Sequence, residues 1–219
     1  MAYKKAQFLH THPLSVHQTT PYIEMKRIAI FASGNGSNAE NIARYFSENT
    51  VAYIVLICSN NPRARVLERA ARLEVPSVTF SNAEFADGVK VLDKLSEAAI
   101  DYIVLAGFMN KIPDVILRAY PEKILNIHPA LLPRHGGKGM YGMHVHEAVI
   151  AAGDRETGIT IHYINSRYDE GRIIFQARCP VLPGDGALEV ATRVHALEYA
   201  YYPQVIEHVV CGTPLPEQA

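Results

Sequence analysis

Five short apolar runs rich in β-branched residues recur along this sequence, separated by stretches long enough for a helix. The runs span 28–32, 53–58, 75–80, 102–106 and 124–127. Between the first four of them, apolar residues at helical spacing fill 38–47, 64–73 and 85–99. Strands that alternate with helices form βαβ units and assemble into a mostly parallel sheet. The sequence therefore predicts an α/β fold with helices flanking that sheet.

The pattern changes after Gly153. Residues 158–164 and 173–181 alternate between apolar and polar side chains, and 168–171 has the composition of a turn. Two alternating runs joined by a turn are typical of a β-hairpin. We therefore expect a hairpin appended to the parallel half of the sheet.

A long final helix is predicted over 187–209, where apolar residues recur at the spacing of a helix packed on a sheet. Pro203 should kink this helix, because proline lacks the backbone N–H that the helix needs. Glu198 falls at the edge of the apolar stripe. A carboxylate in that position must find hydrogen-bond donors or a ligand.

A single domain is expected from residue 25 onward. Residues 1–24 show little alternation and are rich in His, Thr and Pro, whereas Met25 leads directly into the first apolar run. We interpret 1–24 as a dispensable extension, with Met25 as a candidate initiator. No repeat or linker interrupts 25–219, which we interpret as one domain. Intact-mass analysis of the protein from its native source would test this interpretation.

The composition favours a protein whose partners are small molecules. The formal net charge is -1 and the basic residues are scattered, so no nucleic-acid partner is expected. No apolar stretch approaches the roughly 20 residues that span a bilayer, so no membrane association is expected. Cys58, Cys179 and Cys211 have no close pairing, which argues against a disulfide framework or a thiolate zinc site. A reducing cytoplasm is the expected location.

The first apolar run leads into a glycine-rich loop, Ala-Ser-Gly-Asn-Gly-Ser-Asn at 32–38. A helix that starts here would offer free N–H groups and its dipole to a phosphate. Gly36 allows close approach, and Ser37 or Asn38 can cap the helix or bind the phosphate. The loop also fits a loose dinucleotide fingerprint, but 58–61 supplies no acidic residue for a ribose, so a monophosphate is preferred to NAD. An ordinary capped turn is the alternative.

Asn126 and His128 are two residues apart on a predicted strand, so they project from the same face. Pro129 ends that strand at the sheet edge where α/β folds bind ligands. An amide N–H and an imidazolium N–H together suit a developing oxyanion. A structural pair that satisfies loop backbone is the alternative. Asp169 lies in the turn of the predicted hairpin, and from spacing alone it fits a surface turn as well as a functional site.

Two further features carry less specific signals. The glycine-rich segment 136–142 suits a loop over a site, although a plain linker fits as well. His144, His146 and Glu147 look like a ligand cluster. The i, i+2 spacing of the two histidines separates their side chains on a helix, unlike the i, i+4 pair of a zinc helix, so no metal site is expected.

Four motifs, in order, resemble those of the phosphoribosylglycinamide formyltransferase family, the folate-dependent transformylases of purine synthesis. They are Ser-Gly-Asn-Gly-Ser-Asn at 33–38, Leu-Ala-Gly-Phe-Met at 105–109, Leu-Asn-Ile-His-Pro-Ala-Leu-Leu-Pro at 125–133, and His-Tyr through Asp169 to Gly at 162–171. The resemblance covers 26 to about 205. It implies a Rossmann-like formyltransferase fold that transfers a formyl group from 10-formyltetrahydrofolate, the co-substrate, to the amine of glycinamide ribonucleotide.

The resemblance also implies roles for individual residues. The implied catalytic trio is Asn126, His128 and Asp169. The substrate phosphate and ribonucleotide would be held by Gly36, Ser37, Asn38 and Glu198. The folate site would be lined by Leu105, Met109, Asn110, Lys111, Ile112, Ile164 and Asn165. In this hypothesis the Asn126 amide and a protonated His128 meet the oxyanion, and Asp169 orients the imidazole and raises its pKa.

No metal or nicotinamide has a role in that chemistry, and the resemblance leaves the oligomeric state open, with a homodimer compatible. It also places His162 near the active site. Three positions depart from the common pattern: Asn110 stands where Arg is frequent, Glu84 where a basic residue often helps with the phosphate, and His195 where Lys or Gln is common.

Three rival functions remain at this point. A 10-formyltetrahydrofolate hydrolase on the same fold needs no phosphorylated acceptor, so the phosphate loop argues against it. A methionyl-transfer-RNA formyltransferase is disfavoured because no basic C-terminal domain is evident. A noncatalytic nucleotide-binding module would explain the loop but would leave Asn126, His128 and Asp169 without a role.

Overall fold

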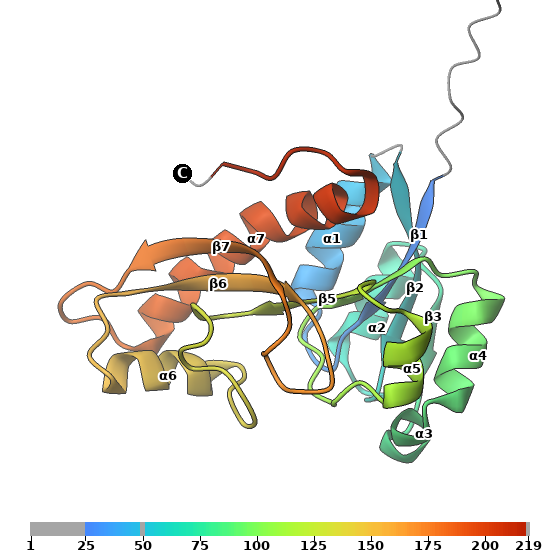
Figure 1. Cartoon of the computed structure of the whole chain (residues 1–219), viewed down its shortest axis with the longest axis horizontal. Coiled ribbons are helices and arrows are strands. Elements are labelled where there is room, and N and C mark those ends of the chain that lie inside the picture. Colours follow the sequence, from blue (N-terminus) through green and yellow to red (C-terminus); the bar gives the residue numbers. More distant parts are fainter. Residues whose placement is uncertain (1–24, 49–50, 218–219) are drawn as a thin grey trace, which may run out of the picture.

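A seven-stranded sheet runs through the described part of the chain, in the order β3-β2-β1-β4-β5-β6-β7 (Figure 1). The structure, a computed structural model, describes residues 25–48 and 51–217, so the predicted extension 1–24 lies outside it. The strands are β1 (Lys26–Phe31), β2 (Ala52–Ser59), β3 (Ser77–Thr79), β4 (Tyr102–Leu105), β5 (Ile124–His128), β6 (Glu156–Tyr163) and β7 (Ile173–Pro180). Strands β1 to β5 pair in parallel, whereas β6 is antiparallel to both β5 and β7. The predicted α/β fold with a terminal hairpin is confirmed.

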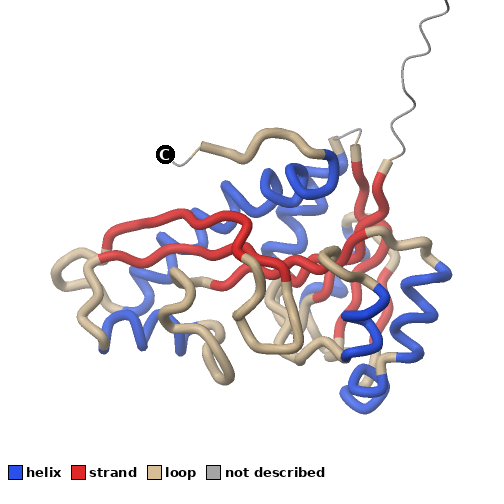
Figure 2. Tube along the Cα trace, in the orientation of Figure 1, coloured by secondary structure: helices blue, strands red, loops and turns tan. Residues whose placement is uncertain are grey.

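Helices cover both faces of this sheet (Figure 2). They are α1 (Ser37–Ser47), α2 (Arg65–Arg72), α3 (Asn82–Asp87), α4 (Val89–Glu97), α5 (Asp114–Ala119), α6 (Met143–Ala151) and α7 (Ala187–Cys211). Because strand side chains alternate, Ile28 and Ile30 of β1 join a core with α1, α2 and α7, whereas Ala29 and Phe31 join a second core with α3, α4 and α5. The sheet is therefore buried on both faces, as expected for parallel strands that are apolar along most of their length.

Several predicted boundaries were wrong. The helix expected over 85–99 is two helices, because Gly88 adopts a left-handed conformation with φ 78° and separates α3 from α4. The strand expected over 75–80 keeps only the three residues of β3, which sits at the sheet edge and pairs with β2 alone. The short helix α5 was not predicted. Helix α7 continues past Pro203 to Cys211, with Tyr202, Val205 and Ile206 fully buried around the proline.

The strand order places a topological switch between β1 and β4. Strands β2 and β3 follow β1 on one side, and β4 and β5 lie on the other. Loops leaving the carboxyl ends of strands on either side of such a switch diverge and leave a crevice, which is where open α/β sheets bind ligands. The loops after β1, β4 and β5 therefore frame the expected site.

Candidate active site

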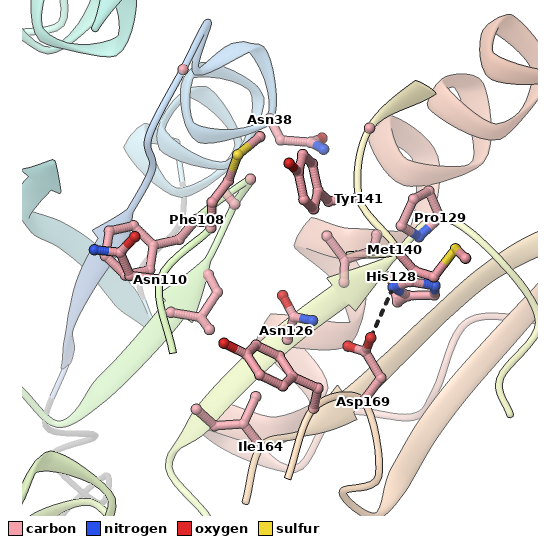
Figure 3. Close-up of a pocket in the computed structure, with 18 of the residues that line it drawn as sticks. Asn38, Phe108, Asn110, Asn126, His128, Pro129, Met140, Tyr141, Ile164 and Asp169 are labelled. Atoms are coloured by element: carbon pink, nitrogen blue, oxygen red, sulfur yellow. Dashed lines mark ion pairs between the residues drawn. The ribbon is translucent and has the colours of Figure 1, made fainter. Parts of the chain in front are cut away.

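A cavity of about 710 Å³ opens at these carboxyl ends (Figure 3). Every residue that the sequence and the resemblance placed in the site lines it. They are Gly36, Ser37, Asn38, Leu105, Met109, Asn110, Lys111, Ile112, Asn126, His128, Ile164, Asn165, Asp169 and Glu198. Elements far apart in the sequence thus contribute to a single cavity. Their individual roles in binding and catalysis stay predictions.

The glycine-rich loop after β1 presents free backbone donors to the cavity. Gly36 has φ 75° and occupies the N-cap position of α1, so Ser37 and Asn38 are the first helical residues and no side chain caps the helix. The first intrahelical bond is donated by the N–H of Glu40 to Gly36, which leaves the preceding N–H groups without helical partners. A Cβ at position 36 would overlap Val66 of α2, so only glycine fits. Of the two alternatives for Ser37 and Asn38, capping of the helix is therefore wrong, and binding of the phosphate stays a prediction.

Glu198 finds the donors that its position on α7 demands. It is 5% exposed, and its Oε2 accepts a hydrogen bond from Asn38 Nδ2 at 2.9 Å. The same oxygen lies 2.9 Å from His195 Nδ1, and this bond raises the pKa of His195. Asn38 Oδ1 is buried without a hydrogen-bond partner among the described residues. This end of the cavity therefore combines a carboxylate, a basic imidazole and an unsatisfied amide oxygen beside the glycine-rich loop.

The Asn126 amide is oriented by His162, which pairs opposite it in the antiparallel register of β5 and β6. His162 is 1% exposed, and burial lowers its pKa, so the ring is neutral at neutral pH. Its Nδ1–H donates to the Tyr163 carbonyl at 2.9 Å, which leaves Nε2 as an acceptor for Asn126 Nδ2 at 3.1 Å. One amide hydrogen of Asn126 is thereby fixed, and the second remains for a ligand.

The imidazole of His128 is held in place by a hydrogen bond from Nε2. It is 3% exposed, and its Nε2–H donates to the His135 carbonyl at 2.8 Å. Its Nδ1 lies 3.6 Å from Asp169 Oδ2 (Figure 3). Burial lowers the pKa of His128, and this outweighs the opposite effect of the Asp169 charge. The neutral form of His128 is therefore favoured in the ligand-free site, and Asp169 acts in the expected direction by raising the pKa. The protonated His128 that would meet the oxyanion stays a prediction.

Asp169 lies in the cavity wall and not in a remote surface turn. It has φ 55°, and its Oδ2 accepts the Gly137 N–H at 2.9 Å. Its Oδ1 lies 3.8 Å from His162 Nε2, so the carboxylate faces both buried histidines. A Cβ on Gly136 would approach Asp169 Cβ to 3.3 Å, so glycine permits this close packing. The segment 136–142 is thus a loop over the site, not a plain linker.

The predicted folate wall follows β4. The Met109 N–H donates to Ser33 Oγ at 3.1 Å, which ties this wall to the glycine-rich loop. Asn110 Nδ2 donates to Asn82 Oδ1 at 2.9 Å, so the amide that replaces the common Arg is anchored to α3. Glu84 does not line the cavity, because it completes the capping box of α3 and pairs with Lys90, whose bond lowers the pKa of Glu84 to about 2. The Glu84 side chain therefore contributes no group to the cavity wall.

His146 also lines the cavity, a position that its spacing in the sequence did not predict. It is 2% exposed on α6, its Nδ1 has no partner among the described residues, and its ring centroid lies 6.3 Å from that of His195. Its neighbour His144 points elsewhere and stacks on Tyr141, as the i, i+2 spacing predicted. No sequence signal separates the two histidines, because burial here depends on how α6 packs against α7.

The buried histidines should make the protein acid-sensitive. Burial lowers the pKa of His128, His146 and His162 below the unfolded value of about 6.5, so the unfolded chain takes up more protons below that pH. Their contribution to stability is full above about pH 6.5 and is lost as the pH falls. His195 has a raised pKa and acts oppositely, stabilising below about pH 6.5. With three groups against one, we expect Tm to fall between pH 7 and 5.5.

Thermal unfolding across this pH range checks the prediction. His146→Gln should flatten the dependence of Tm on pH, whereas His144→Gln, on the same helix but outside the cavity, should leave it unchanged. A Tm that stays constant or rises on acidification would contradict the assignment.

None of the helices within 25–48 and 51–217 is long and apolar enough to cross a bilayer. Over the same residues, no three or more His, Cys, Asp or Glu side chains gather into a group that could hold a metal ion.

Comparison with known proteins finds relatives that are formyl transferases. The formyl transferase family model matches residues 26–206. The chain is 40% identical over 187 residues to the chloroplastic phosphoribosylglycinamide formyltransferase of Arabidopsis thaliana, covering 83% of this chain and 64% of that protein. It is 37% identical over 191 residues to phosphoribosylglycinamide formyltransferase of Bacillus subtilis (strain 168), covering 85% of this chain and 95% of that protein. It thus spans less than two thirds of the Arabidopsis relative and nearly all of the bacterial one.

A solved structure agrees with these relatives. The fold matches the crystal structure of glycinamide ribonucleotide transformylase 1 from Geobacillus kaustophilus with a TM-score of 0.79 and 37% identity, covering 85% of this chain and 100% of that chain. Sequence motifs, strand order and cavity therefore agree: this chain belongs to the formyl transferase family and, within it, to the phosphoribosylglycinamide formyltransferases.

Proposed function

We propose that this chain transfers the formyl group of 10-formyltetrahydrofolate to the amine of glycinamide ribonucleotide, a step of de novo purine biosynthesis. One observation carries the proposal: the glycine-rich loop, the Asn126, His128 and Asp169 side chains, and the wall after β4 all open into one cavity. In this proposal the phosphorylated acceptor lies at the glycine-rich loop, the folate donor lies against the wall after β4, and the polar trio lies between them. We further propose a cytoplasmic location.

The acceptor would lie along the α1 side of the cavity. Its phosphate would accept the N–H groups of Ser37 and Asn38, where the helix dipole also favours an anion. Glu198 would accept hydrogen bonds from the ribose hydroxyls, and the buried Asn38 Oδ1 offers an acceptor that is unsatisfied without a ligand. The donor would lie against the wall that includes Leu105 and Ile112.

In the proposed reaction, the amine lone pair attacks the formyl carbon, a C–N bond forms, and the carbonyl electron pair moves onto oxygen. The second Asn126 N–H stabilises this oxyanion, since the first is held by His162. Neutral His128 carries its proton on Nε2, so Nδ1 can accept the proton that the amine loses. Asp169 then stabilises the imidazolium.

The intermediate collapses when the C=O bond re-forms and the bond from carbon to the folate N10 breaks. His128, or a water relaying its proton, protonates N10, so tetrahydrofolate leaves and the formyl amide remains on the acceptor. No net proton is gained or lost by the protein, because the proton from the amine ends on N10. His128 starts and ends each cycle neutral, in keeping with its lowered pKa.

A spectrophotometric formyl-transfer assay tests the function. Tetrahydrofolate should form from 10-formyltetrahydrofolate only when glycinamide ribonucleotide is present, and the formylated acceptor should appear in equal amount. Formate release without the acceptor would favour a hydrolase instead. Binding of the ribonucleotide with no turnover would favour a noncatalytic module.

A further inference from the structure

Arg69 of α2 contacts the glycine-rich loop from outside the cavity. Its Nε donates to the Asn35 carbonyl at 2.8 Å, and its Nη2 donates to Asn35 Oδ1 at 2.6 Å. Its third nitrogen, Nη1, pairs with Glu40 in the first turn of α1. Arg69 does not line the cavity, whereas Asn35 does. One guanidinium therefore links α2, the loop and the start of α1.

We propose that Arg69 is a positioning residue for the substrate phosphate: its guanidinium fork holds the loop at Asn35 so that the backbone donors of Ser37 and Asn38 are preorganised. This inference rests on the proposed function and adds a residue that touches no substrate. The planar fork suits the task, because it makes directed bonds to two acceptors of one residue, which an ammonium group does not reproduce.

Helix α2 packs against the loop along one face. Val66 lies three residues before Arg69, on the same side of the helix. The Val66 N–H donates to the Gly34 carbonyl at 3.2 Å, and its side chain fills the space where a Cβ of Gly36 would be. Val66 and Arg69 thus hold the loop at three successive positions, 34, 35 and 36. Backbone held in this way loses less freedom when a ligand binds.

Charge gives Arg69 a second effect on the same site. Hydrogen bonds from Arg44 and Arg69 lower the pKa of Glu40, so this carboxylate is ionised close to the expected phosphate position. Left uncompensated, it would repel a phosphate dianion. Arg44 and Arg72 also pair with Glu40, Arg72 at 3.7 Å, but of the three arginines only Arg69 bonds to the loop. Arg72 on the same helix is therefore a matched control.

Steady-state kinetics of the full chain separate loop positioning from charge. Arg69→Met should raise KM for glycinamide ribonucleotide about tenfold, equivalent to about 1.4 kcal/mol, with kcat and KM for the folate within about twofold of wild type. Arg69→Lys keeps a cation near Glu40 but loses the fork, so its KM should also rise, by less. Arg72→Met should match wild type. Equal effects of Arg69→Met and Arg72→Met, or a wild-type KM in both Arg69 variants, would overturn the proposal.

Hydrogen exchange of the ligand-free protein gives a readout that does not depend on activity. The hydrogen-bonded amides around the loop, those of Ser33, Glu40 and Val66, should exchange faster in Arg69→Met and Arg69→Lys than in Arg72→Met, while exchange of β5 stays unchanged. Should Arg69→Met fail to fold, Arg69→Lys decides alone, and wild-type protection in it overturns the inference. If wild-type protein transfers no formyl group, the proposed function fails, yet loop exchange still decides whether Arg69 holds the loop.

Discussion

The Asn126→Asp variant is expected to lower kcat by about 10³-fold, with little change in KM for either substrate. Loss of one oxyanion donor alone costs on the order of 10² to 10³ in kcat. This substitution also puts a carboxylate of nearly the same shape where negative charge develops. We therefore expect its loss of kcat to lie at the upper end of that range. Steady-state kinetics with each substrate varied in turn measure both parameters.

The matched control is Asn126→Ala, which removes the donor without adding charge and should lose about 10²-fold. The aspartate variant should stay folded, because His162 Nε2 lies 3.1 Å from the substituted nitrogen and can take up a proton to pair with the new carboxylate. The pKa of His162, followed by NMR, should therefore rise. If the aspartate variant turned over as fast as the alanine variant, Asn126 would not face the developing charge.

Local periodicity was sufficient to predict much of this site. The alternation in 124–128 places Asn126 and His128 on one face, and Pro129 ends the strand where the cavity begins. Both facts depend on neighbouring residues alone. The glycine-rich loop was likewise predictable, because small residues between a strand and a helix have few structural explanations. The error at its cap arose because Gly36 takes the N-cap conformation and packs on Val66, a contact that depends on α2.

Long-range contacts could not be predicted from the residues themselves. Asp169 reaches His128 only because its turn folds back against Gly136 and Gly137. His162 orients Asn126 through strand register, which no local pattern specifies. The family resemblance predicted the contact between Asp169 and His128, but it did not predict the pairing of His162 with Asn126. The direction of the His128 pKa shift was not predictable for a related reason: the desolvation that lowers this pKa depends on how completely the fold buries the ring.

His128→Ala should lower kcat by about 10² to 10³-fold while substrate binding changes little, because it removes the group that accepts and returns the proton. The loss measures transition-state interactions if KM for both substrates stays near wild type. Wild-type turnover would exclude His128 from the chemistry. The rate should not recover at higher pH, since alanine has no group that can accept a proton at any pH.

Asp169→Asn should lower kcat less, and it should also move the pH profile in a definite direction. In the wild type, neutral His128 is the active form, so activity falls as the pH drops through its pKa. The Asp169 charge raises that pKa, so its removal should shift the acid limb to lower pH while the plateau falls. The asparagine can still accept the Gly137 N–H, so the loop should keep its place. A shift of the acid limb to higher pH would contradict the proposal that neutral His128 is the active form.

The double variant His128→Ala, Asp169→Asn decides whether the two residues act as one unit. If Asp169 works only by stabilising the imidazolium of His128, removing it from a chain that already lacks His128 should cost almost nothing. The double variant should then have the kcat of His128→Ala, as expected for residues that serve one proton transfer. A further loss on adding Asp169→Asn would mean that the carboxylate acts on another group. The second imidazole beside the carboxylate is His162, whose Nε2 lies 3.8 Å from Asp169 Oδ1, so the same loss should then disappear in His162→Gln.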